Sequence, residues 1–375
     1  MKYADRVLKL KTAIKVSTVL VVSFYFIGLL AGRGESTNNV FVKLAGAQPE
    51  ITANISSNGL IRLTLAGEPS LRYVIESSTN LANWSPIITN SAATSNRVFV
   101  VAATGANYFR AWRNPVPLFS FALGAIGNIN LLGNGLVTDS WNSQDTNQSY
   151  NGHYNNYPGT NGHLACAAGV VNPGNGTING NVLLGPPASY AGNSGNITGH
   201  LVFTNLWFPD AVLPTVNWLA APQFKGSHTF TTNGYYIVND SYPITVNPSV
   251  SVTLLFAAPV FNPSYLDIKG GTTNAGTVAL YQEQGSFSLS GANGGAINNR
   301  PQNFIYVGLP GVTNVTISGT ASFVGIIYAP DAAAMLIGGS GSQGIIGAGV
   351  FKSITKTGSY IVHFDESLLT SGPVR

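Results

Sequence analysis

The fold is best predicted from Gly176-Thr-Ile-Asn-Gly-Asn-Val-Leu-Leu184, where two short apolar runs are separated by an Asn-Gly turn. Asn and Gly suit tight turns because both residues tolerate positive φ. The same texture extends from Leu118 to Phe351. Short strands with small or aliphatic inward residues are what stacked coils require. We therefore predict an all-β chain in which residues 118–369 form a β-solenoid of the irregular right-handed β-helix type.

An ordinary β-sandwich is the competing architecture for this region, because no strict repeat period appears. Residues 199–300 are long and aromatic, and the sequence does not show whether they belong to the solenoid or form an insertion. Apart from a short stretch around 213–221, no amphipathic helical pattern follows residue 113. Residues 370–375 are expected to be a tail.

Residues 48–113 predict a separate small β-sandwich. Short segments in which apolar and polar residues largely alternate recur here, and Asn58-Gly59 and Gly67-Glu-Pro69 are among the turns between them. Evenly spaced short strands over about 65 residues favour a sandwich. Residues 114–117, Asn114-Pro-Val-Pro117, read as a short stiff linker.

Residues 1–47 have the pattern of an export signal. Five cationic residues precede Val16, and the uncharged apolar run Val16–Ala31 follows as an expected export helix. Ala45-Gly-Ala47 is a candidate cleavage site, while the run is only slightly short for a bilayer span of about 20 residues. A cleaved signal peptide and an N-terminal membrane anchor both stay open. Either one places the rest of the chain outside the cytoplasm, in the cell envelope or extracellular space.

Charge limits the classes of partner. Only 9% of the residues are charged, and 11 basic and 12 acidic residues remain after residue 47. No basic stripe is left to neutralise phosphates, so nucleic acid is not an expected partner. A surface of Asn, Ser and Thr suits short-range hydrogen bonds to extracellular polysaccharide or other envelope proteins. Exposed edges of the end coils also favour self-association.

The densest group of candidate binding residues lies between residues 139 and 157, beginning with Asp139 and Ser140. Aromatic faces stack on sugar rings, and polar side chains pair with hydroxyls, so this stretch predicts a glycan-binding loop. The expected ligand-binding residues are Trp141, Asp145, Tyr150, His153, Tyr154 and Tyr157. The residues alone favour the structural interpretation, a long turn whose tyrosine rings cap the end of the solenoid, because aromatic rings commonly bury large areas in structural roles.

No catalytic residue, metal site or cofactor is expected. Hydrolase, metalloprotease, P-loop and EF-hand motifs are absent from the sequence, and the five histidines lack zinc-ligand spacing. His200, Lys225, His228 and Asp240 have no spacing that predicts convergence. Asp365 and Glu366 are neighbours, and neighbours in a strand point to opposite faces. Cys166, the single cysteine, is expected to be a small apolar core residue.

Several motifs occur in an order that resembles a domain of unknown function of bacterial surface and pilus-assembly-associated proteins, covering residues 118–369. These motifs are Gly135–Ser143, Gly176–Val182, Phe323–Pro330, Gly344–Gly347 and His363–Leu368. The resemblance implies a β-helical fold and a surface location, with Asp365 bonded to exposed backbone amides of the last coil. Residues Tyr73–Trp84 and Tyr108–Ala111 resemble an immunoglobulin/fibronectin-like module of bacterial secreted proteins, which implies a spacer.

The sequence thus predicts a non-enzymatic exported envelope or extracellular protein with a structural, adhesive or matrix role and glycan binding. One alternative is a carbohydrate-active enzyme, a lyase or hydrolase, with a groove on a β-helix face. A second alternative, a pilus- or secretion-associated accessory protein, rests on the resemblance.

Overall fold

The computed structural model describes residues 50–55, 60–67, 72–91, 96–102, 108–113, 117–132, 135–271, 273–320, 322–338 and 344–373. The expected export segment, residues 1–47, and most of the expected linker lie outside these ranges. In the described ranges no helix is both long and apolar enough to cross a membrane. The chain divides after Asn114 into two compact units.

The smaller unit is built from two antiparallel three-stranded sheets, in the orders β1-β2-β5 and β4-β3-β6. The strands are β1 (Glu50–Ile55), β2 (Leu60–Ala66), β3 (Arg72–Ser78), β4 (Ser85–Ser91), β5 (Asn96–Ala102) and β6 (Tyr108–Arg113). Ile61, Leu63 and Leu65 alternate along β2 and are buried. They share one core with Tyr73 and Phe109 of the second sheet, so the two sheets pack as a sandwich.

The larger unit begins with coils whose strands stack in parallel on three faces. The strands are β7 (Leu123–Ala125), β8 (Ile129–Asn130), β9 (Leu136–Trp141), β12 (Leu164–Cys166), β13 (Val170–Asn172), β14 (Thr177–Ile178), β15 (Val182–Leu184), β16 (Ser189–Tyr190) and β17 (Leu201–Phe203). On the first face β7, β12, β15 and β17 pair in that order, on the second β8, β13 and β16, and on the third β9 and β14. Parallel stacking confirms the solenoid-type fold and contradicts the sandwich alternative.

The second half of the unit continues the parallel stack with further strands, several of which are much longer. They are β18 (Gln223–Phe224), β20 (Gly234–Val238), β22 (Ser251–Phe256), β25 (Thr277–Ser290), β27 (Phe304–Gly319), β28 (Ser322–Gly338), β29 (Gly344–Thr357) and β30 (Tyr360–Asp365), with short β23 (Val260–Phe261) and β26 (Gly294–Gly295). A separate parallel sheet contains β19 (His228–Phe230), β21 (Ile244–Val246) and β24 (Leu266–Ile268). Most of residues 199–300 are therefore solenoid coils, not an insertion.

Short helices and one hairpin complete the unit. They are η1 (Ser194–Asn196), η2 (Trp218–Ala220), η3 (Pro263–Tyr265), η4 (Pro301–Asn303), α2 (Leu368–Ser371) and the hairpin strands β10 (Ser149–Tyr150) and β11 (His153–Tyr154). The stretch expected to be a tail extends the fold, because Leu118 N donates a hydrogen bond to Pro373 O at 2.9 Å.

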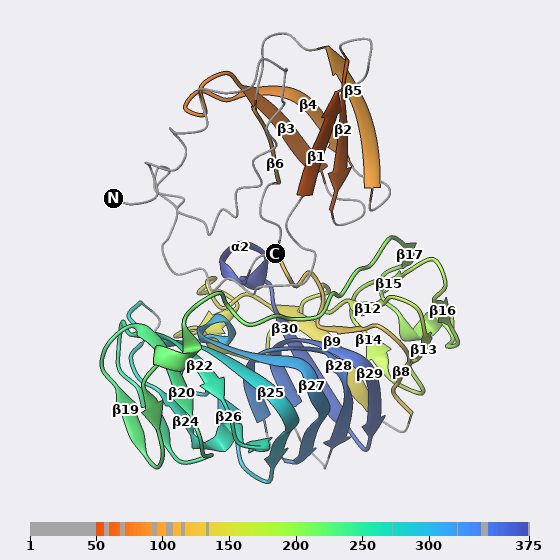
Figure 1. Ribbon diagram of the computed structural model, residues 1–375. Helices are drawn as coiled ribbons and strands as arrows, with labels where there is room; N and C mark the ends of the chain where they lie inside the picture. The colour runs from red at the N-terminus through yellow and green to blue at the C-terminus, as the bar shows by residue number, and fades with distance from the viewer. Residues whose placement is uncertain are drawn as a thin grey trace. The chain divides into compact units, whose positions relative to one another are not determined.

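The order of the coils in space differs from their order in the chain. The last coil pairs with the first, since β29 pairs with β7 and β8, and β30 pairs with β9. Figure 1 shows the consequence: β12–β17 lie at one end of the stack, β19–β24 at the other, and β28–β30 between them. The chain therefore winds from the middle to one end, crosses to the other end, and winds back to the middle.

The crossing is made by residues 204–222, here called the strap, which packs on the outside of the first face. Phe208 meets the ring of Phe121 edge-on at 5.6 Å, and Tyr328 Oη donates to Pro209 O at 2.7 Å. Ten strand spacings of about 4.8 Å, or about 48 Å, separate β17 from β18. Nineteen extended residues reach about 60 Å, so the strap must run nearly straight.

The strap explains why strands of the first face read as continuous apolar runs. In β28 every residue from Phe323 to Ala329 is buried, whereas burial alternates from Asp331 to Leu336. The part of the first segment after the Gly325 corner, Ile326 to Ala329, lies between the strap outside and the core inside, and strands buried on both sides do not alternate. The second segment lies on the second face, whose outer side is open to solvent.

Candidate functional site

The expected binding stretch forms a hairpin between the first and second coils. Ser149 pairs with Tyr154, and Tyr150 pairs with His153, so Asn151 and Gly152 are the two turn residues. Both have positive φ, 51° and 78°, as a two-residue hairpin turn with the strand twist requires. The Asn-Gly dipeptide is the local signal for this turn.

The candidate residues differ widely in exposure. Tyr150 is 71% exposed and Tyr157 44%, so both rings are accessible to a ligand. His153 and Tyr154 are half-buried. Trp141 is fully buried at the end of β9, so its indole faces cannot stack on a sugar from solvent.

Asp145 shapes the backbone next to the hairpin. Its Oδ1 accepts a hydrogen bond from Asn147 N at 2.9 Å, and its carbonyl oxygen accepts from Gln148 N and Ser149 N. This is the local pairing by which Asp stabilises turns. The side chain is therefore engaged in the turn, and it does not line the adjacent cleft.

A buried polar cluster ties the hairpin to the junction of the first and last coils. Asp139 in β9 and His363 in β30 are direct partners across this junction, with Oδ1 and Nδ1 2.5 Å apart. Tyr154 Oη donates to Asp139 Oδ2 at 3.2 Å, and its ring stacks on His363 with centroids 3.7 Å apart. Burial, and then the charge and hydrogen bond of Asp139, raise the pKa of Tyr154 well above its usual range. Tyr154 therefore remains a hydrogen-bond donor.

Two further carboxylates are also held in structural contacts. Asp365 Oδ1 accepts from Ser143 N at 2.9 Å and from Ser367 N at 3.0 Å, so it bonds backbone amides beside the last coil. Burial raises the pKa of Asp365, and these hydrogen bonds partly oppose the rise. Glu366 accepts from Ser140 Oγ at 2.6 Å and from Asn161 Nδ2 at 2.9 Å. Neither carboxylate is placed as an acid–base pair across a common cleft.

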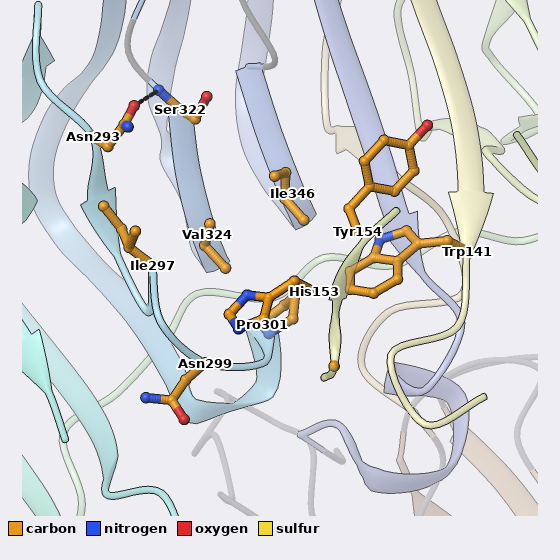
Figure 2. A pocket seen from close by; sticks show the side chains of 11 residues that line it. Trp141, His153, Tyr154, Asn293, Ile297, Asn299, Pro301, Ser322, Val324 and Ile346 are labelled. Carbon is orange, nitrogen blue, oxygen red and sulfur yellow. Dashed lines mark hydrogen bonds between the residues drawn. The ribbon is translucent and has the colours of Figure 1, made fainter. Parts of the chain in front are cut away.

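A cleft of about 190 Å³ opens on the third face beside the hairpin. Figure 2 shows Trp141 and Tyr154 on one side, Asn293 and Ile297 on the other, and Val324 and Ile346 between them. Gly152, His153, Asn299, Pro301 and Ser322 complete the lining. The volume is below the usual 300–1,000 Å³ of small-molecule sites, so the cleft admits one small chemical group.

The polar atoms of the cleft suit hydrogen bonding more than acid–base chemistry. No carboxylate is among its lining residues. Trp141 Nε1 is buried and has no hydrogen-bond partner in the part of the chain that the structure describes. An unpaired buried N–H is costly, and this one is not exposed to the cleft.

Sequence reasoning found one wall of this cleft and missed the other. Trp141, His153 and Tyr154 line it, whereas Asn293, Ile297, Ser322, Val324 and Ile346 come from distant coils. A weak signal existed, because Val324-Gly325 and Ile346-Gly347 are similar dipeptides that stack as partners. His200 and His228 do not converge, since they lie in or beside β17 and β19 at opposite ends of the stack.

Metal ligation has little support in the geometry. Among the described residues no group of three or more His, Cys, Asp or Glu side chains could hold an ion. Cys166 is a buried core residue whose Sγ lies 3.2 Å from Gly127 O, and burial raises the pKa of its thiol. A thiol with a raised pKa is a poor nucleophile at neutral pH.

Comparison with known proteins adds one finding. A family model described as a domain of unknown function, DUF7305, matches residues 225–371. Of the resemblance expected over 118–369, the match supports a domain of unknown function over residues 225–371, which span β19 to β30 and exclude the coils from β7 to β17. The family description names no surface or pilus-assembly role. No curated protein and no solved structure matches the chain. The description of this family assigns no activity to its members.

Proposed function

We propose that this chain is a non-enzymatic, exported protein of the cell envelope or extracellular space that binds polysaccharide. The observation that carries the proposal is the hairpin: Tyr150 is exposed on a turn anchored through Tyr154 beside a cleft. A ring held in place stacks on a sugar at low entropic cost. Such binding would give the protein an adhesive or matrix role.

The cleft supplies a second contact surface next to the stacking ring. Its floor is apolar, at Val324 and Ile346, and the side chains of Asn293 and Ser322 are among the polar groups that line it. A small sugar substituent with an oxygen acceptor and an apolar face suits this lining. Convergence of few polar atoms on an apolar surface is typical of small-ligand sites.

An enzymatic role is less well supported than binding. Glycoside hydrolysis requires two carboxyl groups about 5–9.5 Å apart on either side of the bond. The carboxylates near the cleft, Asp139, Asp365 and Glu366, are all committed to hydrogen bonds within the protein. A lyase or hydrolase remains the alternative that this arrangement disfavours, and an accessory role in pilus assembly or secretion rests on the sequence resemblance.

The remaining parts of the proposal concern placement. Residues 1–47 would direct export and, if retained, would anchor the chain in the membrane. Residues 48–113 would serve as an immunoglobulin/fibronectin-like spacer, and the solenoid would wind in the right-handed sense of the β-helix type. The sandwich core supports the fold assigned to the spacer, and the parallel coils support the β-helix type.

A glycan array with the full chain tests the proposal. Tyr150→Ala and Tyr157→Ala remove exposed rings and are expected to leave the fold intact. Loss of a stacking contact of about 0.5–1.5 kcal/mol should weaken binding about two- to tenfold. Tyr265→Ala, with a 46% exposed ring distant from the hairpin in the chain, is the matched control. Absence of glycan binding, or equal weakening by the control, would refute the proposal.

A further inference from the structure

The solenoid ends at β17 without a cover over its core. Leu201 and Phe203 are the partners of Val182 and Leu184 in β15, both of which point inward and are buried. Yet Leu201 is 43% exposed and Phe203 70%, because among the described residues β17 pairs with β15 alone. Two core positions of the stack are thus open at this end.

The opposite end presents a matching surface. Gln223 and Phe224 of β18 pair with Ile237 and Val238 of β20, and in the described chain β18 has no second partner. Phe224 stacks on His228, with ring centroids 3.7 Å apart. This end therefore presents stacked aromatic rings and an unpaired strand edge at β18.

The two free edges are compatible because of the order of the coils. Every coil-to-coil pairing in the stack is parallel, and the chain advances in one direction along the axis in both halves. The β17 edge of one copy therefore meets the β18 edge of another in the same parallel sense. Stacking two copies in this way would continue the solenoid without a change of strand direction.

We propose that the protein assembles head to tail, with β17 of one copy pairing in parallel with β18 of the next. The pairings within the stack set the register. Strand partners in successive coils form rows along the solenoid axis. The row that contains Leu184 and Val238 ends at Phe203 and Phe224, so these two residues would be partners between copies. The neighbouring row ends at Val202 and Gln223, which would also be partners. The contact buries the two open core positions.

The paired residues of the two edges carry few of the features that keep natural edge strands apart. Protected edges carry charges, prolines or bulges; β17 is Leu-Val-Phe and β18 is Gln-Phe, and Pro222 and Lys225 flank β18 without belonging to it. Beside them, His200 and Lys225 are the titratable side chains within two residues, and no acidic group accompanies them. Charge therefore neither steers the contact nor prevents it. A heterologous contact of this kind does not close, so the expected product is a filament.

Cysteine cross-linking tests the register. The single native cysteine is buried, so introduced thiols can be followed alone. Adjacent parallel strands bring Cα atoms to about 4.8 Å, within disulfide range. In the full chain, Val202→Cys with Gln223→Cys should form a ladder of disulfide-linked oligomers with oxidised glutathione, and each single variant should not. Dimers from Val202→Cys alone would show end-to-end pairing of two β17 strands and overturn the proposal, as would the absence of cross-links from the double variant.

Sedimentation velocity of the full chain in mild detergent tests the apolar contact independently. Leu201→Asp with Phe203→Asp should shift the protein from concentration-dependent oligomers to a single small species. The control is Met335→Asp, because Met335 is 48% exposed but lies in β28, whose two edges are both paired. Unchanged oligomers in the double variant, or a native protein with one sedimenting species at all concentrations, would overturn the proposal. Glycan binding by the dissociated variant would separate this result from the proposed function.

Discussion

At the scale of single residues, the most informative feature is the polar junction between the first and last coils. Asp139 and His363 are paired at 3% exposure each, in the same row of strand partners as Ile346 of the cleft. Removing one member of a buried polar pair leaves the other without a hydrogen bond that it needs. We therefore expect the pair to favour the meeting of these two coils over other pairings.

Removing either Asp139 or His363 alone should lower the free energy of unfolding substantially. In His363→Ala, Asp139 would stay buried with Tyr154 as its remaining donor. We expect a loss of about 3–5 kcal/mol in the free energy of unfolding, measured by urea unfolding followed by circular dichroism. Asp139→Ala with His363→Ala should cost less than the sum of the single changes, since no unpaired charge remains. A loss below about 1 kcal/mol for His363→Ala would argue against a buried, paired histidine.

Asp365 should make stability depend on pH. Burial raises its pKa in the folded state above the value in the unfolded chain. The folded state therefore binds the proton more tightly, and the stability contributed by the protonated carboxyl is full below about pH 4 and declines as pH rises through the folded pKa. Relative to Asp365→Asn, the native protein should lose stability as pH rises from 4 to 8. A constant difference over this range in urea titrations would contradict the shift.

At the scale of elements, glycines let single strands turn the corners of the solenoid. Gly325 in β28 and Gly347 in β29 are stacked partners with φ of 149° and 137°, between the third and first faces. These conformations are open to glycine and strained for other residues. The long strands β28 and β29 can therefore bend from one face to the next without a loop, which keeps Val324 and Ile346 aligned on the cleft floor.

Substitution at a corner should be destabilising. A Cβ at Gly347 would lie 1.9 Å from Gly325 O, and the φ of this residue is unfavourable for alanine. Gly347→Ala should lower the free energy of unfolding by at least about 1–2 kcal/mol, the typical cost of strained backbone before the steric overlap is added. Gly195→Ala is the control, because no atom lies within 4 Å of its added Cβ. Equal unfolding midpoints for the two variants would refute the corner role.

At the scale of the whole solenoid, the chain order is that of a circularly permuted stack. The first and last coils meet in the middle, and the strap joins the two ends. The matched family range, residues 225–371, corresponds to the coils from the far end to this junction. The coils from β7 to β17 extend that part by parallel pairing onto β29 and β30.

A permuted chain should fold to the same structure. Leu118 N and Pro373 O are 2.9 Å apart, so a short Gly-Ser linker can join Pro373 to Pro117. New ends between Leu219 and Ala220 open the strap where both side chains are exposed. The permuted solenoid should give the same circular dichroism spectrum and a thermal midpoint within about 5 °C, because its coils become contiguous and lose no pairing. Failure to fold would show that the chain order itself is required.

What the sequence determined on its own was the local chemistry: Asn-Gly turns, low charge, an all-β chain and the short strands of the first coils, whereas β25, β27, β28 and β29 are longer than predicted. Turn propensity and the alternation of apolar and polar side chains involve residues only a few positions apart. The Tyr150-Asn-Gly-His153 turn and the apolar alternation in β2 can therefore be recognised from the sequence. Coil order, the pairing of Asp139 with His363 and the second wall of the cleft were decided by the tertiary structure. Those contacts join residues more than 130 positions apart. Which apolar strands become neighbours depends on side-chain packing in three dimensions, and the spacing of residues in the sequence does not reveal it.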